Sequence, residues 1–181
     1  MAENAQRRGP AVAERQWLRV LEPATRFSLR GAPEVMAASA NAFGVSPSSA
    51  ACRAVVQGQR AALWLGPDEQ LLIAPASEAD SLRSSLEQAL ASLPHSLVEV
   101  SHRQIALEVR GSYVETILSA YCPLDVDARA FPVGMCTRTV YSKADILLWR
   151  TAPGALRVEV WRSFTDYVIN LMDAVACELG A

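Results

Sequence analysis

Short segments in which apolar and polar residues alternate predict most of the secondary structure of this chain. Over residues 105–110, the side chains of Ile105, Leu107 and Val109 would share one face, as the two-residue period of a strand requires. The segment Glu78–Leu93 instead places leucines three or four residues apart, which is the spacing of the buried face of a helix. Pro94 would end this helix because proline cannot continue it.

The same reading along the whole chain gives an ordered series of strands and helices. Ser77 and Ser163 precede the two longest helical patterns and are expected to be N-caps. The strands are expected at Trp17–Leu21, Arg26–Arg30, Ala51–Gln57, Arg60–Leu65, Gln70–Ala74, Leu97–Ser101, Ile105–Arg110, Thr137–Tyr141, Asp145–Arg150 and Ala155–Trp161, and the helices at Ala32–Phe43, Glu78–Leu93, Ser112–Tyr121 and after Ser163.

The order of these elements is the same in the two halves of the chain, and short sequence matches accompany it. The offset between matching positions grows from 80 to 86 residues, as expected for a duplication with a small insertion in the second copy. The matching segments are Phe27–Gly31 with Leu107–Gly111, Ala62–Trp64 with Leu147–Trp149, Leu71–Ile73 with Leu156–Val158, and Ser77 and Asp80 with Ser163 and Asp166.

This repeat predicts an α+β protein made of two β2-α-β3-α units around a shared core, related by a pseudo-twofold axis. Two copies are too few for an open solenoid, which supports one joint domain. We expect a flexible N-terminus over residues 1–13 and a single domain over 14–181, with the repeats at about 14–94 and 95–181.

Composition and charge exclude several classes of protein. Hydrophobic residues make up 51% of the 181 residues and charged residues 20%, which excludes a disordered chain. A net charge of −2 argues against a general nucleic-acid binder, and no apolar run is long enough for a membrane span. The segment Met1–Pro10 is polar and lacks the apolar stretch of a secretory signal, so a cytoplasmic protein is expected.

Few residues in this chain have the types and spacing that catalysis or metal binding needs. The four cysteines form no C-x-x-C pair and are expected to be reduced thiols, so no zinc site of the usual spacing is expected. No glycine-rich motif for a dinucleotide or nucleoside triphosphate occurs. His102 is either a ligand or acid–base group, or a turn histidine bonded to backbone, and His95 is expected at the surface. Asp125 and Asp127 are either paired carboxylates or a solvated loop.

The strongest surface signal is the pairing of aromatic residues with arginine. Sixteen of the seventeen basic residues are arginine, which reflects either the codon bias of a GC-rich genome or cations used at protein contacts. Trp and Arg are enriched where partner proteins bind most tightly. The candidate interface residues are therefore Trp161, Arg162, Arg150 and Tyr167, with half-buried core residues at strand ends as the alternative.

Five motifs, in order along the chain, resemble the gamma subunit family of heterotetrameric sarcosine oxidase. The resemblance covers roughly Arg26 to the C-terminus. The motifs are Ala62–Leu72, with Trp-Leu-Gly-Pro-Asp-Glu at its centre, Val100–Arg103, Cys122–Asp125, Phe131–Gly134 and Trp161–Tyr167. More distantly, Ser101–Gly111 and the following helix resemble the folate-binding domain of aminomethyltransferases, the glycine-cleavage T proteins. That domain is itself a duplicated β2-α-β3-α fold whose first strands are exchanged between its halves.

The resemblance implies a subunit of a flavoenzyme complex that demethylates sarcosine to glycine, produces hydrogen peroxide and passes the methyl carbon to tetrahydrofolate. It implies that FAD, FMN, NAD, tetrahydrofolate and zinc lie on the other subunits. It also implies that this chain has no catalytic, cofactor-binding or metal-binding residue of its own. The implied partners are the alpha, beta and delta subunits, mainly alpha, with neither nucleic acid nor membrane.

The alternative reading is a free-standing folate-binding protein that transfers one-carbon units, of the aminomethyltransferase type. This chain shows no counterpart of the catalytic carboxylate of the T protein's folate site, and it is too short for that protein's further C-terminal domain. Both differences favour the non-catalytic subunit that docks on a larger one.

Overall fold

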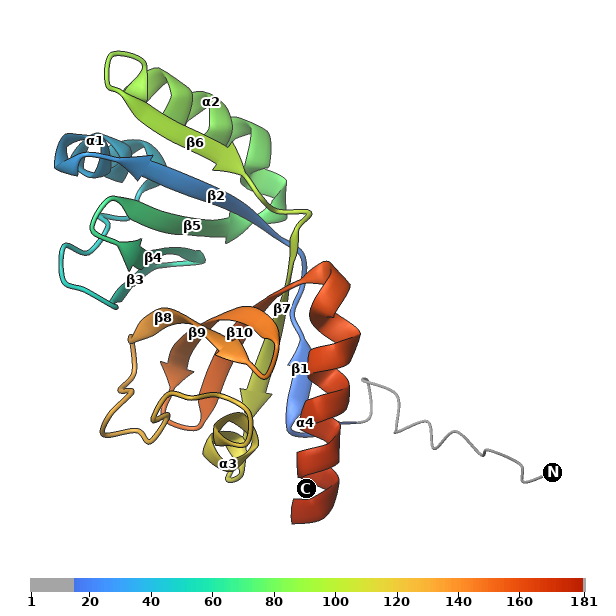
Figure 1. Ribbon diagram of the computed structural model, residues 1–181. Coiled ribbons are helices and arrows are strands. Elements are labelled where there is room, and N and C mark those ends of the chain that lie inside the picture. Colours follow the sequence, from blue (N-terminus) through green and yellow to red (C-terminus); the bar gives the residue numbers. More distant parts are fainter. Residues whose placement is uncertain (1–14, 181) are drawn as a thin grey trace.

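Two five-stranded antiparallel sheets form the centre of the fold in the computed structural model, which describes residues 15–180 (Figure 1). The sheets pack on each other, and each carries two helices on its outer face, so the chain forms four layers. This arrangement agrees with the predicted α+β class. The predicted flexible N-terminus, residues 1–13, lies outside the described residues.

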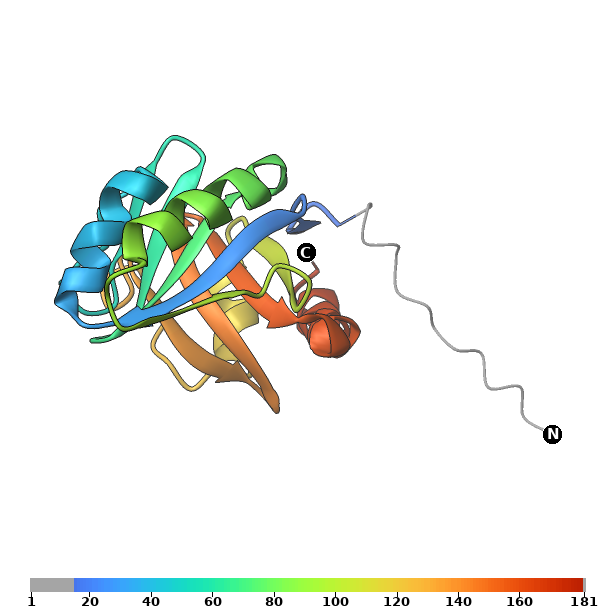
Figure 2. The ribbon, with the colours of Figure 1, turned by 90° about the horizontal axis from the view of Figure 1, so that it is seen from above.

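The first sheet is formed mainly by the first half of the sequence. Its strand order is β3-β4-β5-β2-β6, and all of its pairs are antiparallel. Helices α1 and α2 lie side by side over its outer face, as the view in Figure 2 shows. The bounds are Ala24–Gly31 for β2, Pro33–Phe43 for α1, Ala54–Gln57 for β3, Arg60–Gly66 for β4, Glu69–Pro75 for β5, Ala79–Leu90 for α2 and His95–Glu99 for β6.

The second sheet has the order β1-β7-β10-β9-β8 and is covered by α3 and α4. In β10, Leu156, Val158 and Val160 are fully buried against this helical layer, as the predicted alternation of that strand requires. The bounds are Leu18–Val20 for β1, Gln104–Arg110 for β7, Val114–Ser119 for α3, Cys136–Tyr141 for β8, Ala144–Ala152 for β9, Ala155–Trp161 for β10 and Thr165–Leu179 for α4.

The two sheets exchange one strand each. Strand β1 comes from the start of the chain but pairs with β7, with Leu18 opposite Val109. Strand β6 begins the second half of the chain but pairs with β2, with Phe27 opposite Glu99. Each sheet therefore takes one edge strand from the other half of the sequence, and this exchange ties the halves together.

Three separate apolar clusters stabilise the four layers. One lies between the first sheet and its helices and includes Phe27 and Leu86. A larger one lies between the second sheet and its helices and includes Leu107 and Met172. The third fills the space between the sheets and includes Leu63, Ile73, Cys136, Leu147 and Trp149. Most of the inner face of each sheet is therefore covered by the other sheet, and Arg26 and Glu159, which are directed to that side, are buried.

Main-chain hydrogen bonds join the two sheets along one edge. The backbone N–H of Cys136 donates to the carbonyl of Cys52 at 3.0 Å, and that of Ala54 donates to the carbonyl of Gly134 at 2.8 Å. An isolated antiparallel bridge joins Arg53 to Met135 between these contacts. This edge is closed by backbone, so the space between the sheets opens elsewhere.

The predicted N-caps are wrong, although the helices that they were meant to start are present. Ser77 and Ser163 lie inside short 3₁₀ turns that precede α2 and α4, and neither helix has a side-chain cap bond. The 3₁₀ turns supply the missing acceptors themselves, because the N–H of Ala79 donates to Ala76 and that of Thr165 to Arg162.

Candidate functional site

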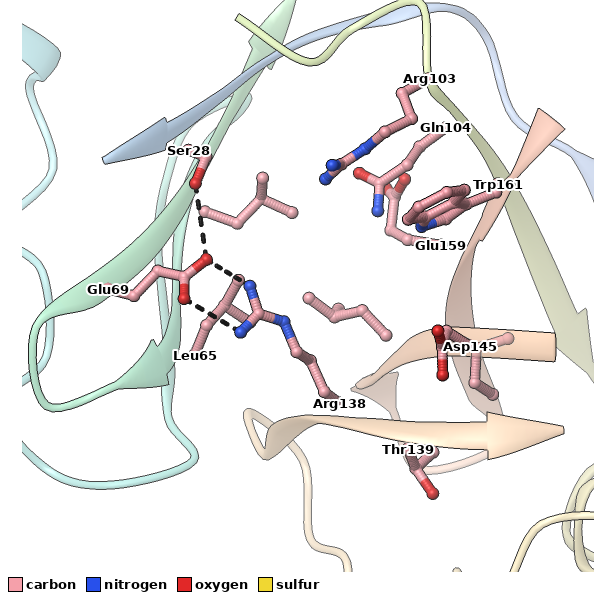
Figure 3. Close-up of a pocket in the computed structure, with 13 residues that line it drawn as sticks. Ser28, Leu65, Glu69, Arg103, Gln104, Arg138, Thr139, Asp145, Glu159 and Trp161 are labelled. Carbon is pink, nitrogen blue, oxygen red and sulfur yellow. Dashed lines mark hydrogen bonds and ion pairs between the residues drawn. The ribbon is translucent and has the colours of Figure 1, made fainter. Parts of the chain in front are cut away.

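The main candidate site is a polar cavity of about 370 Å³ between the two sheets (Figure 3). Strands from both halves of the chain form its walls, so it exists only in the assembled fold. Leucine side chains form its middle, and charged and amide groups stand at its two ends. The lining residues are Ser28, Leu65, Glu69, Leu71, Arg103, Gln104, Arg138, Thr139, Asp145, Ile146, Leu147, Glu159 and Trp161.

At one end of the cavity, Glu69 of the first sheet is clasped by arginines from both sheets. Arg30 donates to its carboxylate at 3.0 Å, and Arg138 reaches across from β8 with two contacts, one of them 3.0 Å long. Ser28 adds a long hydrogen bond of 3.4 Å. Burial by itself would raise the pKa of Glu69, but the bonds and charges of Arg138 and Arg30 outweigh it and lower that pKa. The carboxylate is therefore held ionised.

Glu159, in the wall of the cavity, belongs to a fully buried ion-pair network between the sheets. Its carboxylate accepts a hydrogen bond from Arg26 of the first sheet at 2.8 Å and another from Arg157 of its own strand at 2.8 Å. The side chain of Glu159 is 0% exposed and that of Arg26 is 2% exposed. Arg26 also donates to the carbonyl of Ala24 at 2.9 Å. The network satisfies both signs of charge where the sheets meet.

At the other end, Arg103 lies over the ring of Trp161, with its guanidinium carbon 5.2 Å from the ring centroid. Figure 3 shows the Arg103 guanidinium and the Gln104 amide directed into the cavity. The side-chain oxygen of Gln104 is enclosed and has no donor among the described residues. This end of the cavity therefore carries polar groups that the chain itself leaves unused.

Near this end lies a surface that we call the Trp161 patch, made of Trp161, the following residues Arg162 and Phe164, and His102. Trp161 is 42% exposed and Phe164 is 40% exposed. Arg162 donates to the main-chain carbonyl of His102 at 3.2 Å, which holds it beside the β6–β7 connection. Tyr167, another predicted interface residue, is half-buried and packs against the apolar cluster between the second sheet and its helices, and its hydroxyl donates a 2.9 Å hydrogen bond to Ser142.

Arg150, the fourth predicted interface residue, has no surface to offer a partner. Its side chain is 0% exposed, and it donates to the carbonyls of Phe131 at 2.6 Å and Pro153 at 2.7 Å, to the carbonyl of Val126, and to Glu115 at 2.9 Å. The residues after α3 close over β9 and turn their carbonyls toward this guanidinium. The sequence Trp149-Arg150 indicated an interface. Arg150 instead holds the irregular segment after α3 in place by donating hydrogen bonds to its carbonyls.

The other candidate residues lie at the surface and are not brought together. His95 makes a 2.8 Å contact with the carbonyl of Leu93, and Asp125 accepts a bond from the backbone N–H of Asp127 at 3.0 Å. Arg129 bonds to Asp127 through its side chain and its backbone, and these bonds lower the pKa of Asp127 to about 2. A carboxylate that stays ionised in a turn fits the solvated-loop interpretation rather than proton transfer.

Within residues 15–180, no three His, Cys, Asp or Glu side chains are grouped as metal ligands would be. No helix in the same range is long and apolar enough to cross a membrane.

Sequence reasoning missed the charged residues of the cavity. Arg26, Arg138 and Glu159 lie on strands that were predicted, and Glu69 directly precedes the predicted strand Gln70–Ala74. Each has a polar neighbour in the sequence except Glu159, which stands between Val158 and Val160. In an isolated sheet such positions face water, so the pattern indicated a solvated face. The available signal in the sequence was the uninterrupted apolar run Ile146–Trp149, which is typical of a strand covered on both faces, and these residues are buried in β9.

Comparison of the sequence with known families gives a match over most of the chain. A model of the sarcosine oxidase, gamma subunit family matches residues 30–178. The sarcosine oxidase subunit gamma of Corynebacterium sp. (strain P-1) is 33% identical over 163 residues, which are 88% of this chain and 79% of that protein. The protein of the same name from an Arthrobacter species is 34% identical over 162 residues, 87% of this chain and 79% of that protein.

Solved structures with a similar fold include a chain of the heterotetrameric sarcosine oxidase from Corynebacterium sp. U-96, crystallised in complex with pyrrole 2-carboxylate. The match has a TM-score of 0.84 at 31% identity and covers 91% of this chain and 85% of that chain. The glycine cleavage system aminomethyltransferase T from Bartonella henselae matches with a TM-score of 0.66 at 9% identity, over 86% of this chain and 44% of that one. The second likeness concerns the fold alone.

Proposed function

We propose, because this chain belongs to the sarcosine oxidase gamma subunit family, that it serves as the non-catalytic gamma subunit of a heterotetrameric sarcosine oxidase. The complex would oxidise sarcosine to glycine, reduce oxygen to hydrogen peroxide and transfer the methyl carbon to tetrahydrofolate. FAD, FMN, NAD, tetrahydrofolate and zinc would be held by the alpha, beta and delta subunits. The role of this chain would be to hold the large alpha subunit in its working shape.

The observation that carries the non-catalytic role is the state of the two buried carboxylates in the cavity, Glu69 and Glu159. Glu69 and Glu159 are each held by two arginines, so neither is free to take a proton from a substrate. The exposed Asp127 is likewise held ionised by Arg129. Glu69 and Glu159 stabilise the packing of the sheets, and none of the three carboxylates has the features of a general base.

The surface proposed to dock on the alpha subunit is the Trp161 patch. Trp161 leaves 42% of its surface in water although a tryptophan gains much from burial. Exposed Arg162 beside it can donate charge-assisted hydrogen bonds to a partner. An exposed aromatic residue next to an arginine is the composition expected at the centre of a protein interface.

We also propose that the fold arose by duplication of one β2-α-β3-α unit. Both sheets have the same order when the strands are numbered within each half, and each includes one strand from the other half. The aminomethyltransferase likeness does not favour free-standing one-carbon transfer over the subunit role, because it rests on 9% identity over 44% of that enzyme.

The test of this function is co-purification of the other subunits with the tagged full-length chain. Trp161→Ala should weaken recovery of the alpha subunit, since truncating a central interface tryptophan often costs about 2 kcal/mol of binding or more. The melting temperature of the isolated chain should stay nearly unchanged. Tyr113→Ala is the matched control, because Tyr113 is also 42% exposed but precedes α3, away from the patch. It should leave recovery unchanged.

Two results would contradict the proposal. If Trp161 covers the core of its own chain, Trp161→Ala would melt several degrees earlier, because a loss of about 1 kcal/mol lowers the melting temperature of a chain this size by roughly 2–4 °C. A variant that melts early and still recovers the alpha subunit in full would place the interface elsewhere. If the unmodified chain recovers no flavoprotein partner, the proposal that it is a subunit of such a complex is wrong.

A further inference from the structure

The end of the inter-sheet cavity near Trp161 carries an arginine whose hydrogen-bonding groups are not used by the protein. Arg103 stacks on the ring of Trp161, and a stacked guanidinium keeps its N–H donors free in its own plane. No carboxylate of residues 15–180 forms an ion pair with Arg103. The stacking therefore fixes the direction of a planar, two-pronged donor that points into a cavity.

Gln104, the next residue, presents an acceptor to the same space. Its side-chain oxygen is enclosed, and none of the described residues donates a hydrogen bond to it. Its backbone is fixed because Gln104 pairs with Trp161 in the β7–β10 ladder. An enclosed acceptor without a donor is costly, so a ligand that supplies an N–H group gains from filling this place.

The remaining walls define what else the ligand must contain. Asp145 lines the cavity and has no ion-pair partner among residues 15–180, whereas Glu69 and Glu159 are neutralised by their arginines. Leu65, Leu71 and Leu147 form an apolar wall between the two polar ends. The cavity thus offers an unused cation, Arg103, an unused acceptor, Gln104, and an unused anion, Asp145. A phosphate group does not match this set, because the negative charge of Asp145 would repel it.

We propose that this cavity binds an α-amino carboxylate with an apolar side group. The carboxylate binds the in-plane N–H groups of Arg103, and the ammonium group donates to the side-chain oxygen of Gln104 on the side that carries Asp145. The apolar side group lies along Leu71 and Leu147. A volume of about 370 Å³ accommodates a side group larger than a methyl group. The site shares Trp161 with the patch proposed to dock on the alpha subunit, so its test is made on the chain by itself.

The test is a nuclear magnetic resonance titration of the full-length chain, following the indole N–H of Trp161 and the side-chain amide of Gln104. The probes are L-leucine, 4-methylpentanoate, which lacks the ammonium group, and 3-methylbutylamine, which lacks the carboxylate. L-Leucine should shift both signals in a saturable way. Each of the truncated probes should bind at least about tenfold more weakly, since each loses one charge-assisted hydrogen bond.

Variants separate this site from nonspecific binding. Arg103→Gln should weaken L-leucine binding at least about tenfold, and Gln104→Leu should remove the preference for L-leucine over 4-methylpentanoate. Arg19→Gln is the control, because Arg19 is also an exposed arginine but does not line the cavity. Equal binding of L-leucine and 4-methylpentanoate to the unmodified chain, or unchanged binding in Arg103→Gln, would overturn the proposal. Neither result depends on recovery of the alpha subunit.

Discussion

Glu159 and Glu108 show how the same residue type serves different purposes on neighbouring strands. Both lie in the second sheet, and each pairs with two arginines. The side chain of Glu159 is 0% exposed and faces the other sheet, whereas that of Glu108 is 21% exposed and its ion pairs are 3.5 and 4.0 Å long. Burial decides the difference, because water screens the second carboxylate and is excluded from the first.

We predict that Glu159→Gln destabilises the chain by about 3–5 kcal/mol, because it leaves Arg26 and Arg157 as uncompensated buried cations. Glu108→Gln, the matched control, should cost less than about 1 kcal/mol. Urea unfolding of the three proteins, followed by circular dichroism, measures both values. Equal stability of the two variants would show that the buried network adds nothing to the packing of the sheets.

Strand exchange is the main property at the scale of single elements. Strand β1 has only three residues, yet Leu18 in it is 1% exposed and belongs to the apolar cluster of the second sheet. The elements that follow it in the sequence belong to the first sheet. Strand β1 therefore stabilises a sheet whose other strands come from the second half of the chain. The strand links the two halves through side-chain packing as well as hydrogen bonds.

We predict that Leu18→Ala costs about 2–5 kcal/mol, as expected for a leucine removed from a packed core. Native-state hydrogen exchange should become faster first in β7, where Leu18 lies opposite Val109. The amides of β2, the next strand along the sequence, should be less affected. Faster exchange confined to β2, with β7 unchanged, would contradict the importance of the exchanged strand.

At the scale of the whole molecule, arginine–carboxylate pairs connect the sheets on both sides of the central apolar cluster. Arg26 and Glu159 join β2 to β10, and Arg138 and Glu69 join β8 to β5. The first link is fully buried, and the second has an exposed arginine on a buried carboxylate. The packing of the two sheets therefore depends on ionised carboxylates and becomes sensitive to acid.

The acid sensitivity has a definite direction for Glu69. Its pKa is lowered in the folded chain from an ordinary value of 4.5, so below that value the unfolded chain binds more protons than the folded one. The stabilisation is complete above about pH 4.5 and is lost as the pH falls through the lowered pKa. We predict that Glu69→Gln lowers the unfolding free energy near neutral pH and reduces its fall toward acid.

Unfolding free energies measured between about pH 7 and pH 3 check this prediction. Glu87→Gln is the control, because Glu87 lies on the exposed face of α2, and it should fall with acid as the unmodified chain does. If Glu69→Gln shows the same dependence on pH as the unmodified chain, the clasp of Arg138 and Arg30 on this carboxylate does not stabilise the fold.

The sequence by itself determined the elements and their order, because the periods of strand and helix depend on neighbouring residues. Strand Ala155–Trp161 was predicted with both of its ends, and its alternating face packs on the helices as expected. The four helices were found, with ends that differ by a few residues. The five motifs also indicated the gamma subunit family, to which the chain belongs.

Only the tertiary structure decided what lies on the second face of each sheet. Arg150 and Glu159 have the pattern of residues that face a solvent or a partner, but another layer of the same chain covers them. The cavity, its arginine clasps and the unused groups of Arg103 and Gln104 arise from strands far apart in the sequence. A local pattern records the alternation of faces along a strand, whereas the packing of distant segments determines whether each face meets water, a helix or a second sheet.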